Sequence, residues 1–475
     1  MSTWPSHPDK LQAWPQWSRS RVHRLRRLDG RVALAFFGLL VILVAEGSAV
    51  AHSPVLAAPL LALLLVAVAV EVPLVPFLGV VLLVRVLSDA TLSSPSIRHT
   101  GSLNLSGAIA LLFVLVAAGL VIRRRRGARQ TALAAIWLGL WTAVAVGTHG
   151  ASAETVREGV REISIVSLGV IAYNSNRVLN VTVATRLIQV VGALSAIVAL
   201  GQLATHGGLL INGQMRPDGT FTHPNSASMF FAIAATISLW RFVELGRRRS
   251  DAALSALFCA ATVSTFSLGG LAGLLAMLVA FGALQPGSFS LKMGGFVAAA
   301  LVVVVFVATP LGSERISQEA STSITSASSR GTANTSLAWR LYKWGTLIPE
   351  WEKSPILGQG LGSTVAVEGT SENEAVGKVP HNEYVRYLVE TGLAGVLTLL
   401  WGLGTLLGAL ARRRGNGFYG AGTLGLAIVI GCLINALASN TFLYTTTGYA
   451  TALILGAVLA VPVARGRFAP NSRKA

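Results

Sequence analysis

Long apolar segments, separated by short polar ones, constrain the fold of this chain more than any other feature. Of its 475 residues, 53% are hydrophobic and only 12% are charged, about half the charged fraction of an ordinary soluble domain. About fourteen apolar segments follow one another, most of them close to the roughly 20 residues that a membrane-spanning helix needs. The sequence therefore predicts an all-α polytopic membrane protein and excludes a soluble globular or a disordered one.

The predicted segments occupy residues 32–51, 54–71, 73–88, 105–122, 131–148, 162–175, 182–203, 226–244, 251–267, 269–284, 293–309, 382–410, 418–437 and 445–464. Segment 162–175 is short for a span and fits an interfacial helix as well. Very few residues separate the second segment from the third, and the ninth from the tenth. A count of twelve therefore fits almost as well as fourteen, and we predict 12–14 transmembrane helices.

The distribution of charge predicts the orientation of the chain. Its 38 Lys and Arg residues outnumber 20 Asp and Glu, which gives a net charge of +18; in a soluble protein this excess would suggest nucleic acid as a partner. In membrane proteins, Lys and Arg accumulate on the cytoplasmic side. With the basic N-terminus inside and fourteen alternating spans, 25 basic and five acidic residues face the cytoplasm, against 11 basic and 13 acidic residues outside. We therefore predict that both termini are cytoplasmic and that the partner is a lipid bilayer, with no nucleic acid.

This layout predicts five regions along the chain. They are a basic cytoplasmic N-terminus (1–31), transmembrane helices 1–11 (32–309) with an external motif loop (204–225), a long extracytoplasmic loop (310–381), the C-terminal transmembrane helices (382–464) and a cytoplasmic tail (465–475). The first apolar segment is interpreted as a retained span, because no small-residue cleavage site stands out after it. Within the long loop, Ser321 to Ser336 is Ser/Thr-rich and expected to be flexible, whereas Leu337 to Trp351 has the apolar spacing of an amphipathic helix.

The predicted external segments concentrate the polar residues that are suited to chemistry. Arg216 lies in a turn with Pro217 and Gly219, and His381 stands where the long loop re-enters the membrane. Arginine binds phosphate through bidentate, charge-assisted hydrogen bonds, and histidine exchanges a proton near neutral pH. The candidates are therefore His381 as the titratable group, Arg216 and Arg340 as the anion-binding groups, and Asn382, Lys343, Arg386 and Tyr384 in support.

Each candidate also has a simpler interpretation. A single external Arg is more often a solvated charge, and a His at a helix start is more often a cap. Glu390 fits a pair with Arg386 at i, i+4, which we favour over a catalytic role. Cys259 and Cys432 both lie in apolar segments and have no metal-ligand spacing.

Three blocks of this sequence resemble the O-antigen ligase and O-antigen polymerase superfamily. The family signature is His, then Asn, Ser or Gln, nine residues, Gly, two residues and usually Gly; it matches His381, Asn382, Gly392 and Gly395. Upstream, residues 216–225 resemble the family's Arg-x-x-Gly-Thr-Phe-x-x-Pro-Asn element. Residues 338–344 and 355–360 resemble its third block. The blocks occur in the family's order and span about residues 205–410.

The resemblance implies a GT-C-like, metal-independent, inverting glycosyltransferase without a cofactor, in a bacterial inner membrane. Its donor would be a glycan on undecaprenyl diphosphate, and its active site would face away from the cytoplasm. By matched position, Arg216 and Arg340 would hold the diphosphate, and His381 would orient or deprotonate the acceptor hydroxyl. Gly392 would allow close helix packing. No Asp-x-Asp motif or carboxylate cluster of metal-binding type occurs in the predicted external loops, so arginine is expected to stabilise the leaving group.

Three alternatives remain open at this point. An O-antigen ligase transfers the glycan to a distinct anchor such as lipopolysaccharide, whereas a polymerase joins lipid-linked repeat units; the Arg- and Ala-rich composition favours another wall or capsular polysaccharide over a lipopolysaccharide acceptor. A lipid-linked sugar flippase would have 12–14 spans but usually shows repeated halves, which are not evident here. A peptidoglycan polymerase of the shape, elongation and division type relies on an external acidic residue, against which His381 argues.

Overall fold

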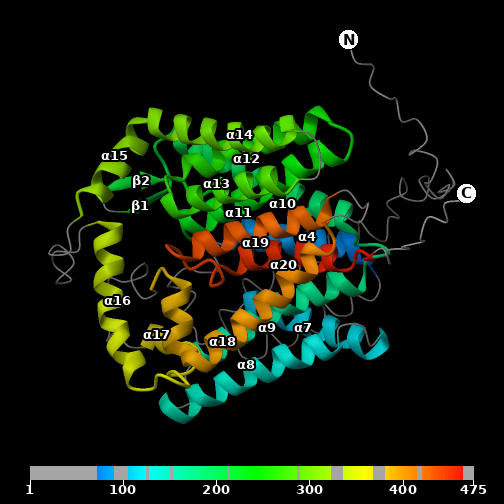
Figure 1. The fold of residues 1–475 in the computed structure, drawn as a ribbon, viewed down its shortest axis with the longest axis vertical. Helices are drawn as coiled ribbons and strands as arrows, with labels where there is room; N and C mark the ends of the chain where they lie inside the picture. The colour runs from blue at the N-terminus through cyan, green and yellow to red at the C-terminus, as the bar shows by residue number, and fades with distance from the viewer. Residues whose placement is uncertain are drawn as a thin grey trace, which may run out of the picture.

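The computed structural model describes residues 72–89, 105–124, 128–149, 153–211, 213–285, 289–322, 335–366, 380–414 and 420–463. Nearly all of them are helical (Figure 1). The predicted segments 32–51 and 54–71, the predicted regions 1–31 and 465–475, and most of the Ser/Thr-rich stretch lie outside the described residues.

Each of the other twelve predicted apolar segments corresponds to a helix, which confirms the all-α architecture. These helices are α4 (Leu74–Leu87), α7 (Leu105–Arg124), α8 (Ala128–His149), α9 (Ala153–Asn174), α10 (Val181–Ala204), α11 (Pro224–Glu244), α12 (Arg249–Ser264), α13 (Leu268–Leu284), α14 (Phe289–Ala308), α18 (Glu383–Ala411), α19 (Ala421–Ala436) and α20 (Thr445–Leu459).

Several of these helices are long and apolar enough to cross a membrane. Within the described residues there are four such stretches, Ser106–Arg123, Val181–Ala204, Pro224–Glu244 and Glu383–Ala411. The pair Met293–Ala308 and Pro310–Ala320, bent by 88°, would add a fifth. Helices α4, α13, α19 and α20 and most of α8 are apolar but shorter. The chain is thus a multi-pass membrane protein, and the count of 12–14 spans stays a prediction.

Helix α11 forms the centre of the bundle. Its residues from Pro224 to Ser238 are all buried, and it packs against α10, α12, α13, α19 and α20. In Figure 1 it lies in the middle of the stack of helices, with α12 and α14 above it and α18 and α8 below. Because lipid is as apolar as these side chains, such helices associate through close packing of small residues. A Cβ atom on Gly431 of α19 would lie 2.7 Å from the Gly273 carbonyl oxygen of α13, so glycine is required at this contact.

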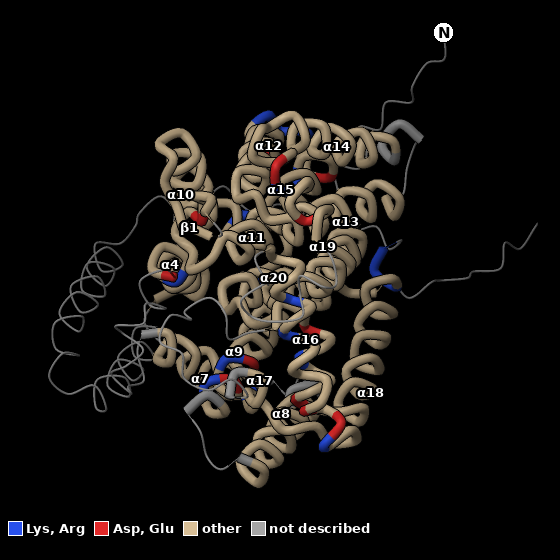
Figure 2. Tube along the Cα trace, turned by 90° about the vertical axis from the view of Figure 1, so that its left-hand side faces the viewer, with Lys and Arg blue, Asp and Glu red and all other residues tan. Residues whose placement is uncertain are grey.

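The connections at one end of the bundle are structured. A hairpin of β1 (Leu209–Ile211) and β2 (Gln214–Arg216) pairs Leu210 with Met215. The helices there are α15 (Pro310–Ala320), α16 (Ser336–Glu352) and the single turn α17 (Ser363–Ala366). These elements lie on the left of Figure 1, and Figure 2 looks onto this end. We call it the motif end, because it carries all three family-like blocks.

The predicted amphipathic helix is confirmed as α16. The Thr335 hydroxyl caps it by accepting a hydrogen bond from Ala338 N. The hairpin, in contrast, was not predicted, although the dipeptide Asn212–Gly213 between its strands is a strong hairpin signal.

The opposite end of the bundle carries clusters of arginine. Residues 247–249 follow α11, and residues 412–414 follow α18. The Arg413 side chain donates hydrogen bonds to the carbonyl oxygens of Val461 (3.0 Å) and Leu459 (2.7 Å), which ties the end of α18 to the end of α20. Both clusters are among those that the charge distribution predicts to be cytoplasmic.

Candidate functional site

The β1–β2 hairpin places Arg216 in the interior of the motif end. Arg216 is only 4% exposed. Its Nε donates a hydrogen bond to the Thr265 carbonyl oxygen (3.0 Å), and one terminal nitrogen donates to Asn225 Oδ1 (3.3 Å). Asn225 Oδ1 also accepts from the Ser267 hydroxyl (2.8 Å). The connection between α12 and α13 and the first turn of α11 thus fix this guanidinium.

The turn that follows Arg216 is held by side chains from two other helices. Gln202 Oε1 of α10 accepts hydrogen bonds from the backbone N–H groups of Asp218 (3.0 Å) and Gly219 (2.7 Å). Asp89, just after α4, accepts from the backbone and hydroxyl groups of Thr222 (3.1 and 3.0 Å). Gly219 has a φ of +64°, and a Cβ atom there would lie 2.7 Å from Ser195 Oγ, so the motif requires glycine at this position.

His223 belongs to the same turn and caps α11. Its Nδ1 accepts a hydrogen bond from Asn225 N (3.1 Å), so the neutral ring carries its proton on Nε2. Burial is the main cause that lowers the pKa of His223 well below its ordinary 6.5, and the charges of His381, Arg216 and Arg340 add to it. His223 is therefore uncharged at neutral pH.

His381 stands directly before α18 and faces His223. The two ring centroids lie 6.0 Å apart. Asn440, in the connection between α19 and α20, places its Nδ2 3.1 Å from His381 Nδ1. Pro380, the preceding residue, accepts a hydrogen bond from Trp344 Nε1 of α16 (2.8 Å). His381 is thus positioned by α16 on one side and by the α19–α20 connection on the other.

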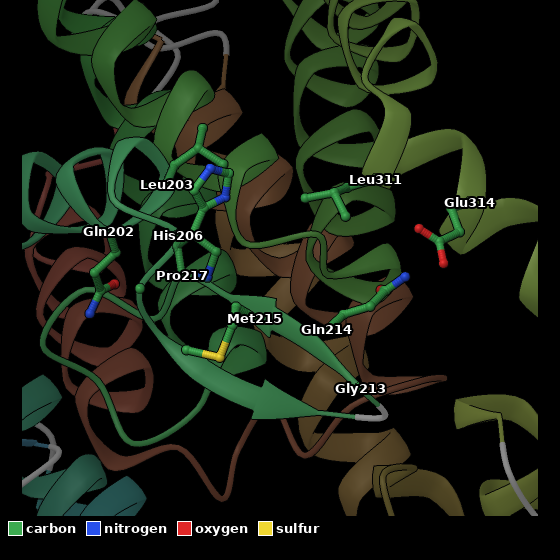
Figure 3. A pocket seen from close by; sticks show the side chains of 10 residues that line it. Gln202, Leu203, His206, Gly213, Gln214, Met215, Pro217, Leu311 and Glu314 are labelled. Carbon is green, nitrogen blue, oxygen red and sulfur yellow. The ribbon is translucent and has the colours of Figure 1, made fainter.

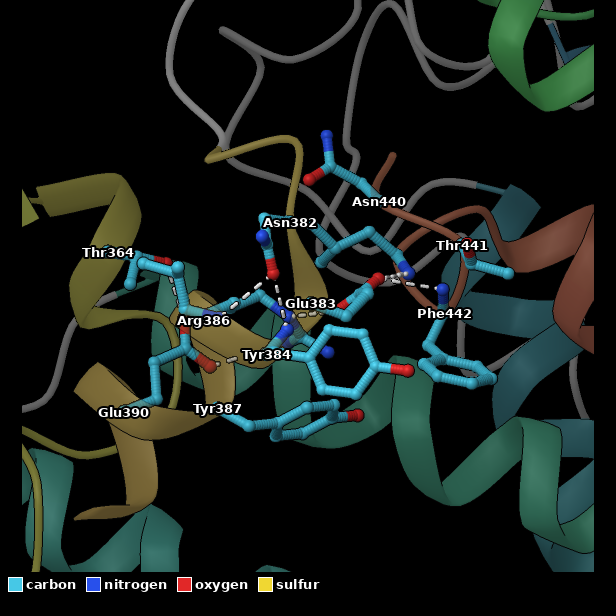
Figure 4. A network of polar contacts seen from close by, with 12 residues as sticks. Thr364, Asn382, Glu383, Tyr384, Arg386, Tyr387, Glu390, Asn440, Thr441 and Phe442 are labelled. Carbon is cyan, nitrogen blue, oxygen red and sulfur yellow. Dashed lines mark hydrogen bonds and ion pairs between the residues drawn. The ribbon is translucent and has the colours of Figure 1, made fainter. Parts of the chain in front are cut away.

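The two residues after His381, Asn382 and Glu383, stabilise the start of α18 and its contact with the α19–α20 connection. The Asn382 side chain caps α18 by accepting hydrogen bonds from Tyr384 N (2.9 Å) and Val385 N (3.1 Å) (Figure 4). Glu383 accepts backbone hydrogen bonds from Phe442 (2.7 Å) and Leu443 (3.1 Å). Glu383 therefore holds the connection that carries Asn440 against the start of α18.

The side chains of Arg386 and Tyr384 contact the neighbouring helices α9 and α19. Arg386 forms ion pairs with Glu383 (2.6 Å), Glu390 (3.3 Å) and Glu162 of α9 (3.3 Å). The pair with Glu390 confirms the predicted i, i+4 interaction. Tyr384 is 43% exposed, and its hydroxyl donates to the Leu433 carbonyl oxygen of α19 (3.0 Å). These contacts indicate that Arg386 and Tyr384 join α18 to α9 and α19.

The signature glycine Gly392 lies at a break in α18. Its φ of 59° and ψ of −169° are non-helical and belong to a region that is essentially restricted to glycine. Segment 355–360 pairs with the broken turn: Gln359 N donates to Val389 O (2.8 Å), and Leu393 N donates to Pro355 O (2.9 Å). A Cβ atom on Gly392 would lie 2.3 Å from the Ile356 carbonyl oxygen. Two of the family-like blocks, 355–360 and the signature, therefore meet at this glycine.

Helix α16 carries the other basic candidates. Arg340 is half-buried, and its Nε is buried without a hydrogen-bond partner in the part of the chain that the structure describes. Lys343, one turn further on, is only 1% exposed. Burial lowers the pKa of Arg340, and nearby Glu319 opposes this effect.

A third arginine, Arg315 of α15, is close to the same site and was not predicted. It is 4% exposed and forms an ion pair with Glu319 (3.0 Å). Burial, followed by the charges of Arg315 and Arg340, lowers the pKa of Arg216 to about 9. The guanidinium stays protonated at neutral pH, and its positive charge is poorly compensated. The motif end therefore concentrates cationic charge suited to binding an anion.

A cavity of roughly 350 Å³ lies beside this site. It is bounded by the hairpin, the end of α10 and the start of α15, and its lining includes Gln202, Met215, Pro217, Leu311 and Glu314 (Figure 3). The three arginines and His381 do not line it. The described residues contain no group of three or more His, Cys, Asp or Glu placed to hold a metal ion.

The fold and this arrangement define a multi-pass α-helical membrane protein with a cationic site at one end of its bundle. Residues 252–400 match the family model of the O-antigen ligase. This match confirms the resemblance to the O-antigen ligase and polymerase superfamily, a superfamily of glycosyltransferase-like enzymes that act on lipid-linked glycans. It includes Arg340, Lys343 and the signature from His381 to Gly395, whereas Arg216 precedes it. No curated protein sequence matches the chain.

Proposed function

We propose that this protein transfers a glycan from an undecaprenyl diphosphate carrier to an acceptor hydroxyl on the extracytoplasmic side of a bacterial inner membrane. One observation carries the proposal. Arg216, Arg340 and His381 are far apart in sequence, yet their elements meet at one end of the bundle, where the rings of His223 and His381 lie 6.0 Å apart. Such an arrangement suits a reaction in which an anion departs while a proton is removed nearby.

The arginines supply what a diphosphate leaving group needs. As the bond between the sugar and the phosphate oxygen breaks, negative charge develops on the diphosphate, and fixed cations stabilise it. Arg216 is held rigidly by Thr265 and Asn225, so its orientation is set before the donor binds. This assignment needs no metal ion, because guanidinium groups provide the positive charge.

His381 is suited to receive the proton of the acceptor hydroxyl. The acceptor oxygen then attacks the anomeric carbon from the face opposite the diphosphate, so one displacement inverts the configuration there. Asn440 determines which ring nitrogen is basic. The Asn440 amide nitrogen is placed 3.1 Å from Nδ1; with the amide oxygen assigned to that position instead, Oδ1 would accept the Nδ1 proton, and Nε2 would be the basic nitrogen.

The charge distribution supports the proposed side of the membrane. The arginine clusters 247–249 and 412–414 lie at the end of the bundle opposite the motif end. Because Lys and Arg favour the cytoplasmic side, the motif end would face outward. The same layout would leave both termini in the cytoplasm.

Reconstitution with a purified lipid-linked glycan donor tests the proposal. We expect glycan transfer by the wild-type protein in the presence of a metal chelator, and loss of transfer in Arg216→Ala, Arg340→Ala and His381→Ala at wild-type protein levels. Full activity of His381→Ala would refute the proposed mechanism.

Deletion of the protein in its host distinguishes a ligase from a polymerase. Long glycan chains that accumulate on the carrier would indicate a missing ligase, the function we favour. Single repeat units on the carrier would indicate a polymerase of the same superfamily. An unchanged pool of lipid-linked glycan would contradict both.

A further inference from the structure

The acidic residue Glu319 is bound inside the cationic site. Its Oε1 accepts a hydrogen bond from Arg315 (3.0 Å), and its Oε2 accepts one from Leu337 N (2.8 Å). Arg315 also donates to the Ser336 hydroxyl (3.0 Å). Both Ser336 and Leu337 belong to the first turn of α16, and Arg340 follows about one helical turn later. Glu319 and Arg315 of α15 therefore contact the first turn of α16, and Arg340 lies on the next turn of that helix.

Helix α15 also faces the strand that carries Arg216. Leu311 and Glu314 of α15 and Met215 and Pro217 around β2 line the same cavity. Arg315 points inward from this helix, because it is 4% exposed whereas Glu314 is exposed. The Nε atoms of Arg315 and Arg340 are buried and have no hydrogen-bond partner in the described part of the chain. Each of these arginines thus retains a donor for a bound anion.

The formal charges of these four residues can be compared with those of the reactants. Arg216, Arg315 and Arg340 contribute +3, and Glu319 lowers this sum by one; Lys343, which is also buried on α16, is a further basic residue near the site. A diphosphate that links a sugar to a lipid is a diester with two negative charges. After transfer, its terminal phosphate is a monoester, whose second ionisation has a pKa of about 6. The released lipid diphosphate therefore carries close to three negative charges at neutral pH.

We propose that Arg315 is a third diphosphate-binding residue and that Glu319 lowers the positive charge of the site by one, which favours the doubly charged donor over the more highly charged product. This inference rests on the proposed function. The Glu319 carboxylate repels the extra negative charge that the product carries. Product release is thereby favoured over product retention.

Binding of two probes to the full-length protein in detergent micelles tests the inference by calorimetry at low ionic strength. Inorganic pyrophosphate represents the product, and a dialkyl diphosphate with two charges represents the donor. Glu319→Gln removes the negative charge and keeps an oxygen that can accept from Leu337 N. We expect it to tighten pyrophosphate binding on the order of tenfold and to tighten binding of the dialkyl diphosphate less.

Three variants serve as controls. Glu314→Gln removes the same charge from an exposed position on the same helix and should leave both affinities unchanged. Glu319→Asp keeps the charge and should bind pyrophosphate as the wild type does. If Glu319→Gln does not fold, the double variant Arg315→Gln with Glu319→Gln restores the wild-type net charge of the site and should restore the wild-type ratio of the two affinities.

A turnover measurement provides an independent readout. In Glu319→Gln, later turnovers should be slower than the first, because product stays bound. Equal pyrophosphate affinities in the wild type and Glu319→Gln would overturn the inference, and so would pyrophosphate binding that Arg216→Ala leaves unchanged. If the wild type binds no pyrophosphate and Arg216→Ala retains activity, the proposed function itself fails.

Discussion

The imidazole rings of His223 and His381 lie 6.0 Å apart, yet their contacts differ. His223 accepts the backbone N–H that begins α11, and burial and nearby positive charges keep it neutral. His381 contacts Asn440 and stands at the start of α18. The structure thus provides a matched pair of histidines, one with a capping role and one with a proposed chemical role.

Replacing each histidine by asparagine separates these roles. An asparagine side chain at residue 223 can still accept the capping hydrogen bond, so His223→Asn should retain near wild-type transfer. His381→Asn removes the proposed base and should lower the transfer rate by about 100-fold or more. Rates of glycan transfer in reconstituted vesicles provide the measurement. Equal losses in both variants would contradict the assignment of His381.

The arginines should not be replaceable by lysine. Arg216 donates to two acceptors at fixed positions, and a lysine ammonium cannot reproduce that planar geometry. Arg216→Lys and Arg340→Lys should each lose roughly 10- to 100-fold in kcat/KM for the lipid-linked donor. Lys353→Gln is a suitable control, because Lys353 is exposed and pairs with Glu350 in its own helix. Wild-type kinetics in both lysine variants would rule out bidentate phosphate binding.

The lowered pKa of His223 predicts how stability depends on pH. Below about pH 6.5, the unfolded chain binds a proton at His223 that the folded chain does not bind. The free energy of unfolding should therefore fall as the pH falls, by up to about 1.4 kcal/mol per pH unit from this residue. Thermal unfolding in detergent from pH 7 to pH 5 measures the effect. His223→Asn should show a shallower dependence, and an unchanged one would show that His223 is protonated in the folded state.

The break in α18 predicts a strong effect of a single methyl group. Gly392→Ala places a Cβ atom where the Ile356 carbonyl oxygen lies, at a backbone conformation that only glycine adopts readily. We expect a loss of at least about 2 kcal/mol in stability, seen as a lower yield and a lower Tm. Gly402→Ala, in the same helix, meets no atom within 4 Å and should be neutral or slightly stabilising. Equal Tm values for the two variants would contradict this account of Gly392.

The helices could be predicted from the sequence because hydropathy and segment length largely determine them. Helix α16 was also predictable, since its apolar residues recur at helical spacing. Hairpin β1–β2 was not predicted, because three-residue strands carry too little periodicity; the dipeptide Asn212–Gly213 was the available signal.

The candidate site was predictable only where motifs mark it. Arg216, Arg340 and His381 lie in motif positions, whereas Arg315, Asn440 and Glu319 reach the site through tertiary contacts alone. The functional distinction between His223 and His381 depends on the group that each ring contacts, a backbone N–H for His223 and the Asn440 amide for His381, and no pattern in the sequence specifies that.

The hydrogen bond from Trp344 Nε1 to the Pro380 carbonyl oxygen affects how the chain would respond to a change in the length of the stretch that precedes His381. It joins α16 to the residue before His381 across 36 positions of the sequence. Segment 355–360 is separately fixed against the break in α18. The stretch between residues 366 and 380 therefore connects two points that are each anchored independently. An insertion or deletion between these two points should therefore leave the position of the histidine unchanged.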